Sequence, residues 1–227
     1  MKDFINKYIA NSKVILDQLD IDQISKMISI LIETREKEGR LFILGVGGGA
    51  GHASHAVNDF RKICGIEAYS PSDNVSELTA RVNDDGWDTS YVNWLMGSRL
   101  KKNDSLLVFS VGGGNLEKSV SVNIVKSLQY AKEKGSKVCG IVGRDGGYTA
   151  EIADACVIVP PIDSENITLT KTLNNEFGML FLIGQDNLKF KKKNEFIVYI
   201  GSHGDHGAEC ADIILPGSTY TEQDGHF

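Results

Sequence analysis

Two stretches near the start of the chain repeat apolar residues with the spacing of a helix. The first covers residues 4–19 and the second 21–32, with apolar positions three or four residues apart. Asp20 stands where it can cap the second helix, and Gly39 where it can end it. Neither helix carries an obvious reactive side chain, so we expect the pair to serve packing or oligomerisation.

From residue 40 onward, short apolar runs alternate with helical stretches. Strands are predicted at 41–44, 106–109, 138–142 and 155–159, and helices at 53–63, 116–134 and a short stretch ending at 152. Because these strands lack polar alternation and lead into helices, they indicate a parallel sheet covered on both faces. We therefore predict an α/β fold, a parallel sheet flanked by helices in a three-layer sandwich of the flavodoxin-like or Rossmann-like kind.

The C-terminal part departs from this alternation. Apolar runs at 179–183, 196–200 and 213–215 are candidate strands, which either extend the first sheet or stand outside it. Residues 189–193 are rich in lysine and are predicted to form an exposed linker.

Composition adds limits to this picture. The 227 residues are 41% hydrophobic and 24% charged, as in an ordinary globular protein, and their formal net charge of −6 gives no reason to expect nucleic acid or an anionic membrane as partner. The four cysteines form no CxxC pair, which argues against a thiolate zinc site. No apolar run is long enough for a membrane span, and the charged N-terminus is unlike a signal peptide, so we expect a cytoplasmic protein.

Two glycine-rich loops follow predicted strands and open predicted helices. Backbone N–H groups in such loops can approach a phosphate, and a helix N-terminus adds partial positive charge. The first loop, GVGGGAG at 45–51, also fits a relaxed dinucleotide fingerprint with Glu67 downstream. A single dinucleotide site does not need two such loops, so we predict a phosphorylated sugar as ligand and expect no NAD. The predicted binding residues are Gly47, Gly48, Gly49, Ser110, Val111, Gly112, Gly113, Gly114 and Asn115.

Polar side chains follow the first loop. His55 and Asp59 are four residues apart on a predicted helix and therefore share a face, which His52 could join. An imidazole and a carboxylate so placed could bind a divalent metal, act as an acid/base pair, or form a solvated polar face. A third cluster, NDDG at 83–86, has the composition of a turn and includes Asp84.

Together these features resemble the SIS-domain phosphoheptose isomerases over about residues 3–168. The resemblance is carried by the two leading helices, GVGGGAGHASHAVNDF, NDDG, FSVGGGN and GIVGRDGGYTAEIADACVIVP, in that order. It implies aldose–ketose isomerisation of sedoheptulose 7-phosphate through an enediol, in a site built between subunits of a homotetramer. His55 then matches a metal ligand and a catalytic position, with zinc as the metal. Asp59 stands where a glutamate ligand is usual, and Asp84 matches a catalytic aspartate near the reacting carbons.

The sequence also departs from the family pattern. Val46 and Gly49 stand where an asparagine and a serine are usual, and the second loop has fewer hydroxyl groups, so backbone N–H groups would do more of the binding. The family's last helix carries a glutamine and, about two turns later, a histidine. After residue 168 this chain has no histidine before His203 and no such pair at helical spacing.

The C-terminal residues, about 179–227, resemble a different protein. They are similar to a fragment of the large iron–sulfur subunit of NADH:quinone oxidoreductase (complex I), taken from the molybdopterin-oxidoreductase-like part of that subunit. The resemblance is carried by SHGDHGAE, ADIILPG and TYTEQDG, and it implies a loop role for His203 and His206. No cysteine cluster is present for an iron–sulfur centre. We therefore predict an isomerase domain at 1–168 and an atypical tail at 169–227, joined by gene fusion or a broken reading frame.

Three alternatives to a working isomerase stay open at this point. The missing glutamine and histidine favour a non-catalytic sugar-phosphate-binding module. A dinucleotide-dependent oxidoreductase is compatible with the first glycine loop. An electron-transfer subunit is suggested only by the resemblance of the tail, and the cysteine ligands of an iron–sulfur centre are missing.

Overall fold

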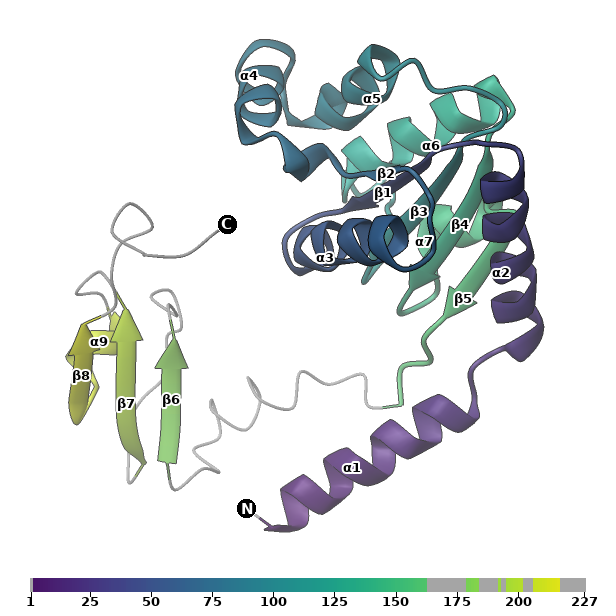
Figure 1. The fold of residues 1–227 in the computed structure, drawn as a ribbon. Coiled ribbons are helices and arrows are strands. Elements are labelled where there is room, and N and C mark those ends of the chain that lie inside the picture. Colours follow the sequence, from purple (N-terminus) through teal and green to yellow (C-terminus); the bar gives the residue numbers. More distant parts are fainter. Residues whose placement is uncertain (1, 163–178, 184–191, 193–194, 202–205, 217–227) are drawn as a thin grey trace. The chain divides into compact units, whose positions relative to one another are not determined.

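The computed structural model describes residues 2–162, 179–183, 192, 195–201 and 206–216 (Figure 1). The chain divides into two compact units. The larger is Ser12–Ile162, and the other combines Met1–Asn11 with Asp163–Phe227. Helix α1 (Lys2–Asp17) is the first of the two predicted leading helices.

The larger unit is built on a parallel sheet with the strand order β2-β1-β3-β4-β5. Its strands are β1 (Leu41–Gly45), β2 (Ala68–Tyr69), β3 (Ser105–Ser110), β4 (Lys137–Val142) and β5 (Ala155–Ile158). The four predicted strands are confirmed, and β2 adds a fifth at the edge. Because β2 has only two residues, it shows no periodicity that sequence reasoning could detect.

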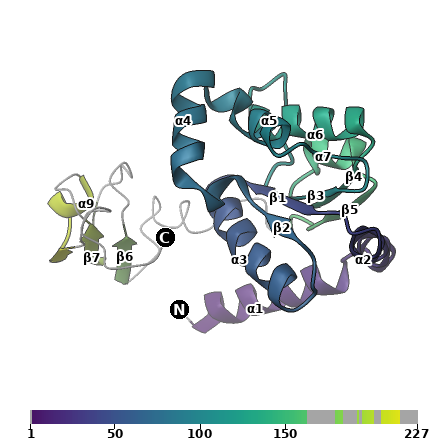
Figure 2. The ribbon, with the colours of Figure 1, turned by 45° about the horizontal axis from the view of Figure 1, so that its top comes forward.

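Helices cover both faces of this sheet, as Figure 2 shows. They are α2 (Ile21–Glu36), α3 (Gly48–Lys62), α4 (Val75–Asp85), α5 (Trp87–Gly97), α6 (Val122–Lys134) and α7 (Gly147–Ile152), with a 3₁₀ turn η1 (Pro71–Asp73). Residues of α2 and α3 pack on one face, and residues of α5 and α6 on the other. The predicted three-layer α/β sandwich is therefore confirmed.

Alternate residues of each central strand enter the two hydrophobic cores. Leu41 and Ile43 of β1 belong to the core under α2 and α3, whereas Phe42 and Leu44 belong to the core under α5 and α6. All four are at most 1% exposed. Burial on both faces explains why these strands read as unbroken apolar runs.

A buried ion pair ties β1 to β3 at their amino ends. Arg40 Nη2 lies 2.7 Å from Asp104 Oδ2, and the Asp104 side chain is 3% exposed. The same guanidinium donates to the carbonyl oxygens of Ser98 and Arg99. This pairing fixes the register of the two strands whose opposite ends carry the glycine loops.

The predicted helix boundaries around both glycine loops were wrong. Helix α3 begins at Gly48 and not at residue 53, because the glycines form its first turn. Helix α6 begins at Val122 and not at residue 116, because residues 115–120 close into a turn of their own. NDDG is not a simple turn. Its first three residues form the last turn of α4, and Gly86, with φ +82°, joins α4 to α5.

The other unit contains a separate sheet. Strands β6 (Met179–Ile183), β7 (Phe196–Gly201) and β8 (Ile213–Pro216) are parallel in the order β6-β7-β8, with a short helix α9 (His206–Glu209) between the last two. The three candidate strands are thus confirmed, and they do not extend the first sheet. Three predictions fall outside the described residues. They concern His203, residues 169–178, which directly follow the point where the family resemblance stops, and the linker at 189–193 apart from Lys192.

Among the helices of the described ranges, none combines the length and the apolar character that a membrane crossing requires.

Candidate functional site

The two glycine loops leave neighbouring strands at the same edge of the sheet. Gly45, the last residue of β1, is paired with Phe109 of β3. A Cβ added to Gly49 would lie only 2.6 Å from Phe109 O, so the first loop packs directly against the end of β3. The predicted binding residues of both loops are therefore brought together at the carboxyl edge, where ligands of parallel sheets bind.

The first loop presents an open helix N-terminus. Gly47 is the N-cap of α3 with φ +57°, and Gly48 is its first residue. An added Cβ at either position would meet nothing within 4 Å. Within the described residues, their N–H groups make no hydrogen bond, whereas Gly49 N–H donates to Val46 O. The first turn of α3 therefore has free donors and the space for an anion.

Hydrogen bonds within the loop and from α7 hold the second loop in place. Gly113 N–H donates to Ser110 Oγ (3.1 Å), so the oxygen of the one hydroxyl group of the loop acts as an acceptor. Gly113 O accepts from both N–H and Oγ1 of Thr149, at 2.9 and 2.7 Å. Tyr148 N–H donates to Gly114 O (2.9 Å). The carbonyl oxygens are thus turned toward α7 and bonded there, which suits a loop that offers its N–H groups to a ligand.

Asn115 has a structural role at the end of this loop. It exchanges two backbone hydrogen bonds with Val120, and its Oδ1 accepts from Lys118 N–H (2.8 Å). Ser119 and Ser121 then adopt left-handed backbones, with φ of +51° and +48°, before α6 begins. The structure therefore assigns the Asn115 side-chain oxygen to a turn, and Asn115 as a ligand residue stays a prediction.

His55 and Asp59 pair on α3 as predicted. His55 Nε2 lies 3.3 Å from Asp59 Oδ2, and the two side chains are 78% and 46% exposed. The exposed His52 stands apart, edge-on to the Phe109 ring with 6.5 Å between ring centroids. Both histidines lie near the loops, and Asp59 pairs with His55 and not with His52.

The next question is whether His55 and Asp59 could form part of a zinc site. Zinc in proteins takes three or four side-chain ligands. Across the described ranges, no group of three or more histidine, cysteine, aspartate or glutamate residues is placed to hold a metal. His55 and Asp59 therefore supply an incomplete donor set, and we assign no chemical step to zinc.

Asp84 lies on the exposed last turn of α4. Its Oδ1 accepts a hydrogen bond from the Asn83 side chain (2.8 Å). Within the described residues, no hydrogen bond or ion pair joins Asp84 to His55 or to either glycine loop. Its place near the reacting carbons thus stays a prediction.

Sequence reasoning missed Tyr91, which supports the first loop. Its hydroxyl donates to Gly45 O (2.7 Å) at the point where β1 passes into the loop. The side chain is 2% exposed, and burial raises the pKa of Tyr91 to about 12. No motif marks this residue, because its contact depends on the packing of α5 against the sheet.

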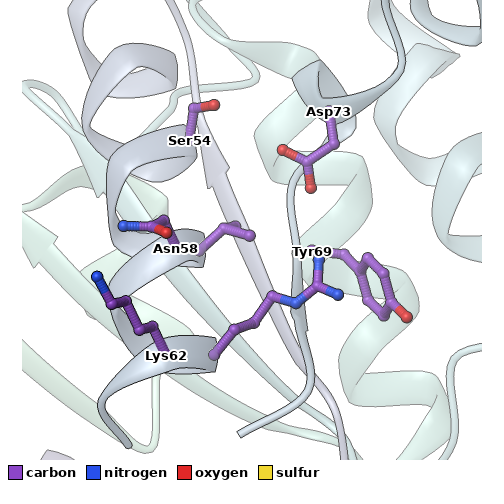
Figure 3. Close-up of a pocket in the computed structure, with 7 residues that line it drawn as sticks. Ser54, Asn58, Lys62, Tyr69 and Asp73 are labelled. Atoms are coloured by element: carbon purple, nitrogen blue, oxygen red, sulfur yellow. The ribbon is translucent and has the colours of Figure 1, made fainter.

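Sequence reasoning also missed a groove of about 520 Å³ beside α3. Figure 3 shows Asp73 and Tyr69 across from side chains of α3. The Arg61 guanidinium lies over the Tyr69 ring, 5.6 Å from its centroid, and burial raises the pKa of Asp73. The groove is lined by Ser54, Val57, Asn58, Arg61, Lys62, Tyr69 and Asp73, and so by no residue of either glycine loop.

Comparison with known proteins identifies the family to which the chain belongs. The family model "SIS domain" matches residues 7–143. A phosphoheptose isomerase from Helicobacter pylori strain Shi470 is 34% identical over 147 residues, covering 62% of this chain and 72% of that protein. Another, from strain P12, is 31% identical over 177 residues, covering 73% of this chain and 86% of that protein. The chain belongs to the phosphoheptose isomerase family of SIS-domain proteins.

Solved structures of this family share the fold. A phosphoheptose isomerase from Neisseria gonorrhoeae superposes with a TM-score of 0.62 at 21% identity, covering 73% of this chain and 88% of that one. One from Francisella tularensis gives 0.55 at 20% identity, covering 73% and 87%. The resemblance predicted for residues 3–168 is thereby confirmed.

A second family model, "Molybdopterin oxidoreductase", matches residues 149–227. The match agrees with the resemblance predicted for the C-terminal residues. The two models match successive parts of the chain, and the SIS model matches the part that contains both glycine loops and the His55–Asp59 pair.

Proposed function

We propose that this chain is an isomerase that interconverts sedoheptulose 7-phosphate and an aldose heptose 7-phosphate. The observation that carries the proposal is the meeting of two glycine loops on β1 and β3, with His55 and Asp59 about two and three turns along α3. The relatives named phosphoheptose isomerase, at 31–34% identity, support the same reaction.

In this proposal the substrate bridges the two loops. N–H groups of the second loop hold the phosphate, while the first loop and the start of α3 face the carbonyl end of the sugar. A base removes a proton from C1, the C2 carbonyl oxygen takes up a proton, and a cis-enediol forms. The O1–H proton then leaves as the C1 carbonyl forms, and C2 receives a proton, which completes the isomerisation.

We assign the proton transfer at carbon to His55. Asp59, at 3.3 Å, orients the imidazole and stabilises the imidazolium that forms when it takes the proton. Asp84 is assigned a place near the reacting carbons by the family resemblance. Zinc bound by His55 and Asp59 would prevent the imidazole from acting as the base, so no step of this proposal uses zinc.

The proposal includes self-association. Helix α1 exposes Ile5, Tyr8, Ile9 and Leu16, with exposed fractions of 47–67%. An apolar stripe of this kind is typical of a helix that packs against another chain. We therefore propose a homo-oligomer, a tetramer by family resemblance, which size-exclusion chromatography with light scattering tests.

Turnover in D₂O tests the proposed reaction. The full chain is incubated with sedoheptulose 7-phosphate, with and without zinc, and products are followed by proton NMR. We expect an aldose product carrying deuterium at C2, because the enediol takes up a solvent proton. H55Q is expected to reduce kcat at least 100-fold, the usual loss when an acid/base group is removed. H52Q, the same change one turn earlier, should stay within about threefold of wild type; an equal loss in H52Q would assign the chemistry elsewhere.

A non-catalytic sugar-phosphate-binding module is the second candidate. The sequence after residue 168, which lacks the family's glutamine and histidine at helical spacing, favours it. The two candidates differ in one experiment: a binding module is stabilised thermally by sedoheptulose 7-phosphate but gives no labelled aldose in D₂O at any zinc concentration.

For the C-terminal part, we propose a fusion or frame error that joined an SIS domain to a fragment of another protein. The match of two unrelated family models to successive parts of the chain supports this origin. The boundary near residue 168 is tested by sequencing the DNA around the codons for residues 168–172 in independent isolates. One uninterrupted reading frame in every isolate would contradict a frame error.

A further inference from the structure

The turn between β4 and α7 packs directly on the second glycine loop. Gly143 N–H donates to Ser110 O (3.2 Å). A Cβ on Gly147 would lie 2.2 Å from Gly112 O, and one on Gly113 would lie 1.8 Å from Gly146 O. Because such contacts leave no room for adjustment, the turn GRDGG at 143–147 has a fixed position relative to the loop.

Arg144 is the one cationic residue of this turn, and it lies beside the loop. Its Nη1 is 3.9 Å from the position that a Cβ would take on Gly112. Arg144 is exposed, and its backbone has φ +53°, a left-handed conformation that long side chains rarely adopt. Strain of this kind is retained where the surrounding structure or a function demands it.

The charge of Arg144 is not used within the described part of the chain. No carboxylate there lies within ion-pair distance of its guanidinium. The neighbouring Asp145 accepts from Gly147 N–H (3.2 Å) within the same turn. The guanidinium is therefore available to an anion from solution.

The second loop has few side-chain donors for an anion. Ser110 provides its one hydroxyl group, whose oxygen accepts from Gly113 N–H, so an anion would find at most one O–H donor beside the N–H groups of the loop. Within the described residues, the N–H groups of Gly112 and Gly114 make no hydrogen bond. A guanidinium next to these donors would add charge and paired, planar hydrogen bonds, the geometry that suits phosphate.

We propose that Arg144 binds the phosphate group of the substrate beside the second glycine loop and thereby gives the site its selectivity for phosphorylated over free sugars. This inference rests on the proposed isomerase function. It assigns the charge that the hydroxyl-poor loop lacks to a residue in the turn that follows β4.

The test compares R144Q with R99Q. Arg99 is a matched control: it is exposed, it has the same φ of +53°, and it lies at the amino end of β3, at the opposite edge of the sheet. We expect R144Q to raise KM for sedoheptulose 7-phosphate and Ki for inorganic phosphate about tenfold or more, with kcat changed less than about threefold. R144K should recover part of the loss, and R99Q should match wild type.

Two further results separate a binding role from a structural one. R144G removes the charge and relieves the left-handed strain, so we expect the same loss of phosphate affinity without a fall in Tm. R99G should keep both Tm and phosphate affinity. Equal KM and Ki values in wild type, R144Q and R144G would overturn the proposal.

A binding measurement keeps the test independent of turnover. If the wild type produces no aldose, the proposed isomerase function fails, but calorimetric titration with inorganic phosphate and sedoheptulose 7-phosphate still measures Kd. Binding to wild type and R99Q that is lost in R144Q supports the Arg144 site. Equal Kd values in all three proteins, or no binding to wild type, overturn it.

Discussion

Replacing Gly113 by alanine tests whether the second glycine loop is fixed by close packing. Gly113 has φ +67°, and an added Cβ would lie 1.8 Å from Gly146 O, far inside the 3.4 Å at which ordinary contact begins. Neither group can move freely, because Gly113 O accepts two hydrogen bonds from Thr149. The substitution therefore forces the loop and the β4–α7 turn apart.

The expected cost has three sources. Left-handed backbone costs alanine about 1 kcal/mol relative to glycine. Relieving the overlap costs about 1–3 kcal/mol, as in other overpacked sites. Lengthening the two hydrogen bonds from Thr149 adds about 1 kcal/mol. Because one displacement relieves several of these terms together, we expect a loss of about 3 kcal/mol in the free energy of unfolding.

Urea unfolding followed by tryptophan fluorescence measures this loss. Both tryptophans of the chain, Trp87 and Trp94, lie in the larger unit, and Trp94 packs in the core under α5 and α6. G112A is the matched control, because a Cβ on Gly112 would meet only Arg144 Nη1 at 3.9 Å. It should change stability by less than about 0.5 kcal/mol. A G113A loss below 1 kcal/mol, or equal losses in both variants, would refute the packing argument.

Three further predictions concern residues outside the loop. Y91F should cost about 1–2 kcal/mol in urea unfolding and raise KM, because it leaves Gly45 O buried without its donor. Burial opposes the charge on Asp154, but hydrogen bonds from Lys132, Val138 N–H and Lys137 outweigh it and lower its pKa to about 2. Since the folded pKa lies below the unfolded one, the stability difference between wild type and D154N should be full above about pH 5 and disappear below about pH 2. Burial raises the pKa of Cys139 to about 12, so native Cys139 should resist thiol reagents at pH 8 and react only in urea, as mass spectrometry of labelled peptides would show.

Apolar patterning was sufficient to predict the central sheet. Strands buried on both faces must be apolar at every position, and a helix must bury a stripe of one face. The runs at 41–44 and 106–109 therefore predicted β1 and β3, and with them the place of both glycine loops. The spacing of His55 and Asp59 predicted their pairing for the same reason, since residues four apart on a helix meet.

Local patterning failed where glycine or short length removed the signal. Gly48 and Gly49 read as a loop, yet they form the first turn of α3, and the end of β3 packs against Gly49. The edge strand β2 has two residues, and within the sheet it pairs with β1. Helix α5 lacks the clear apolar stripe of a surface helix, so nothing in the sequence indicated that Tyr91 reaches Gly45.

The fold class, the two glycine loops and the His55–Asp59 pair could be predicted from the sequence, because each depends on residues close together in the chain. The groups that support those loops could be identified only in the folded structure. The bond from Tyr91 to Gly45 spans 46 residues, and that from Thr149 to Gly113 spans 36. Arg144 likewise reaches Gly112 from the turn that follows β4, the neighbouring strand of β3. Contacts of this kind follow from the order of the strands, which parallel pairing and its crossovers fix in three dimensions.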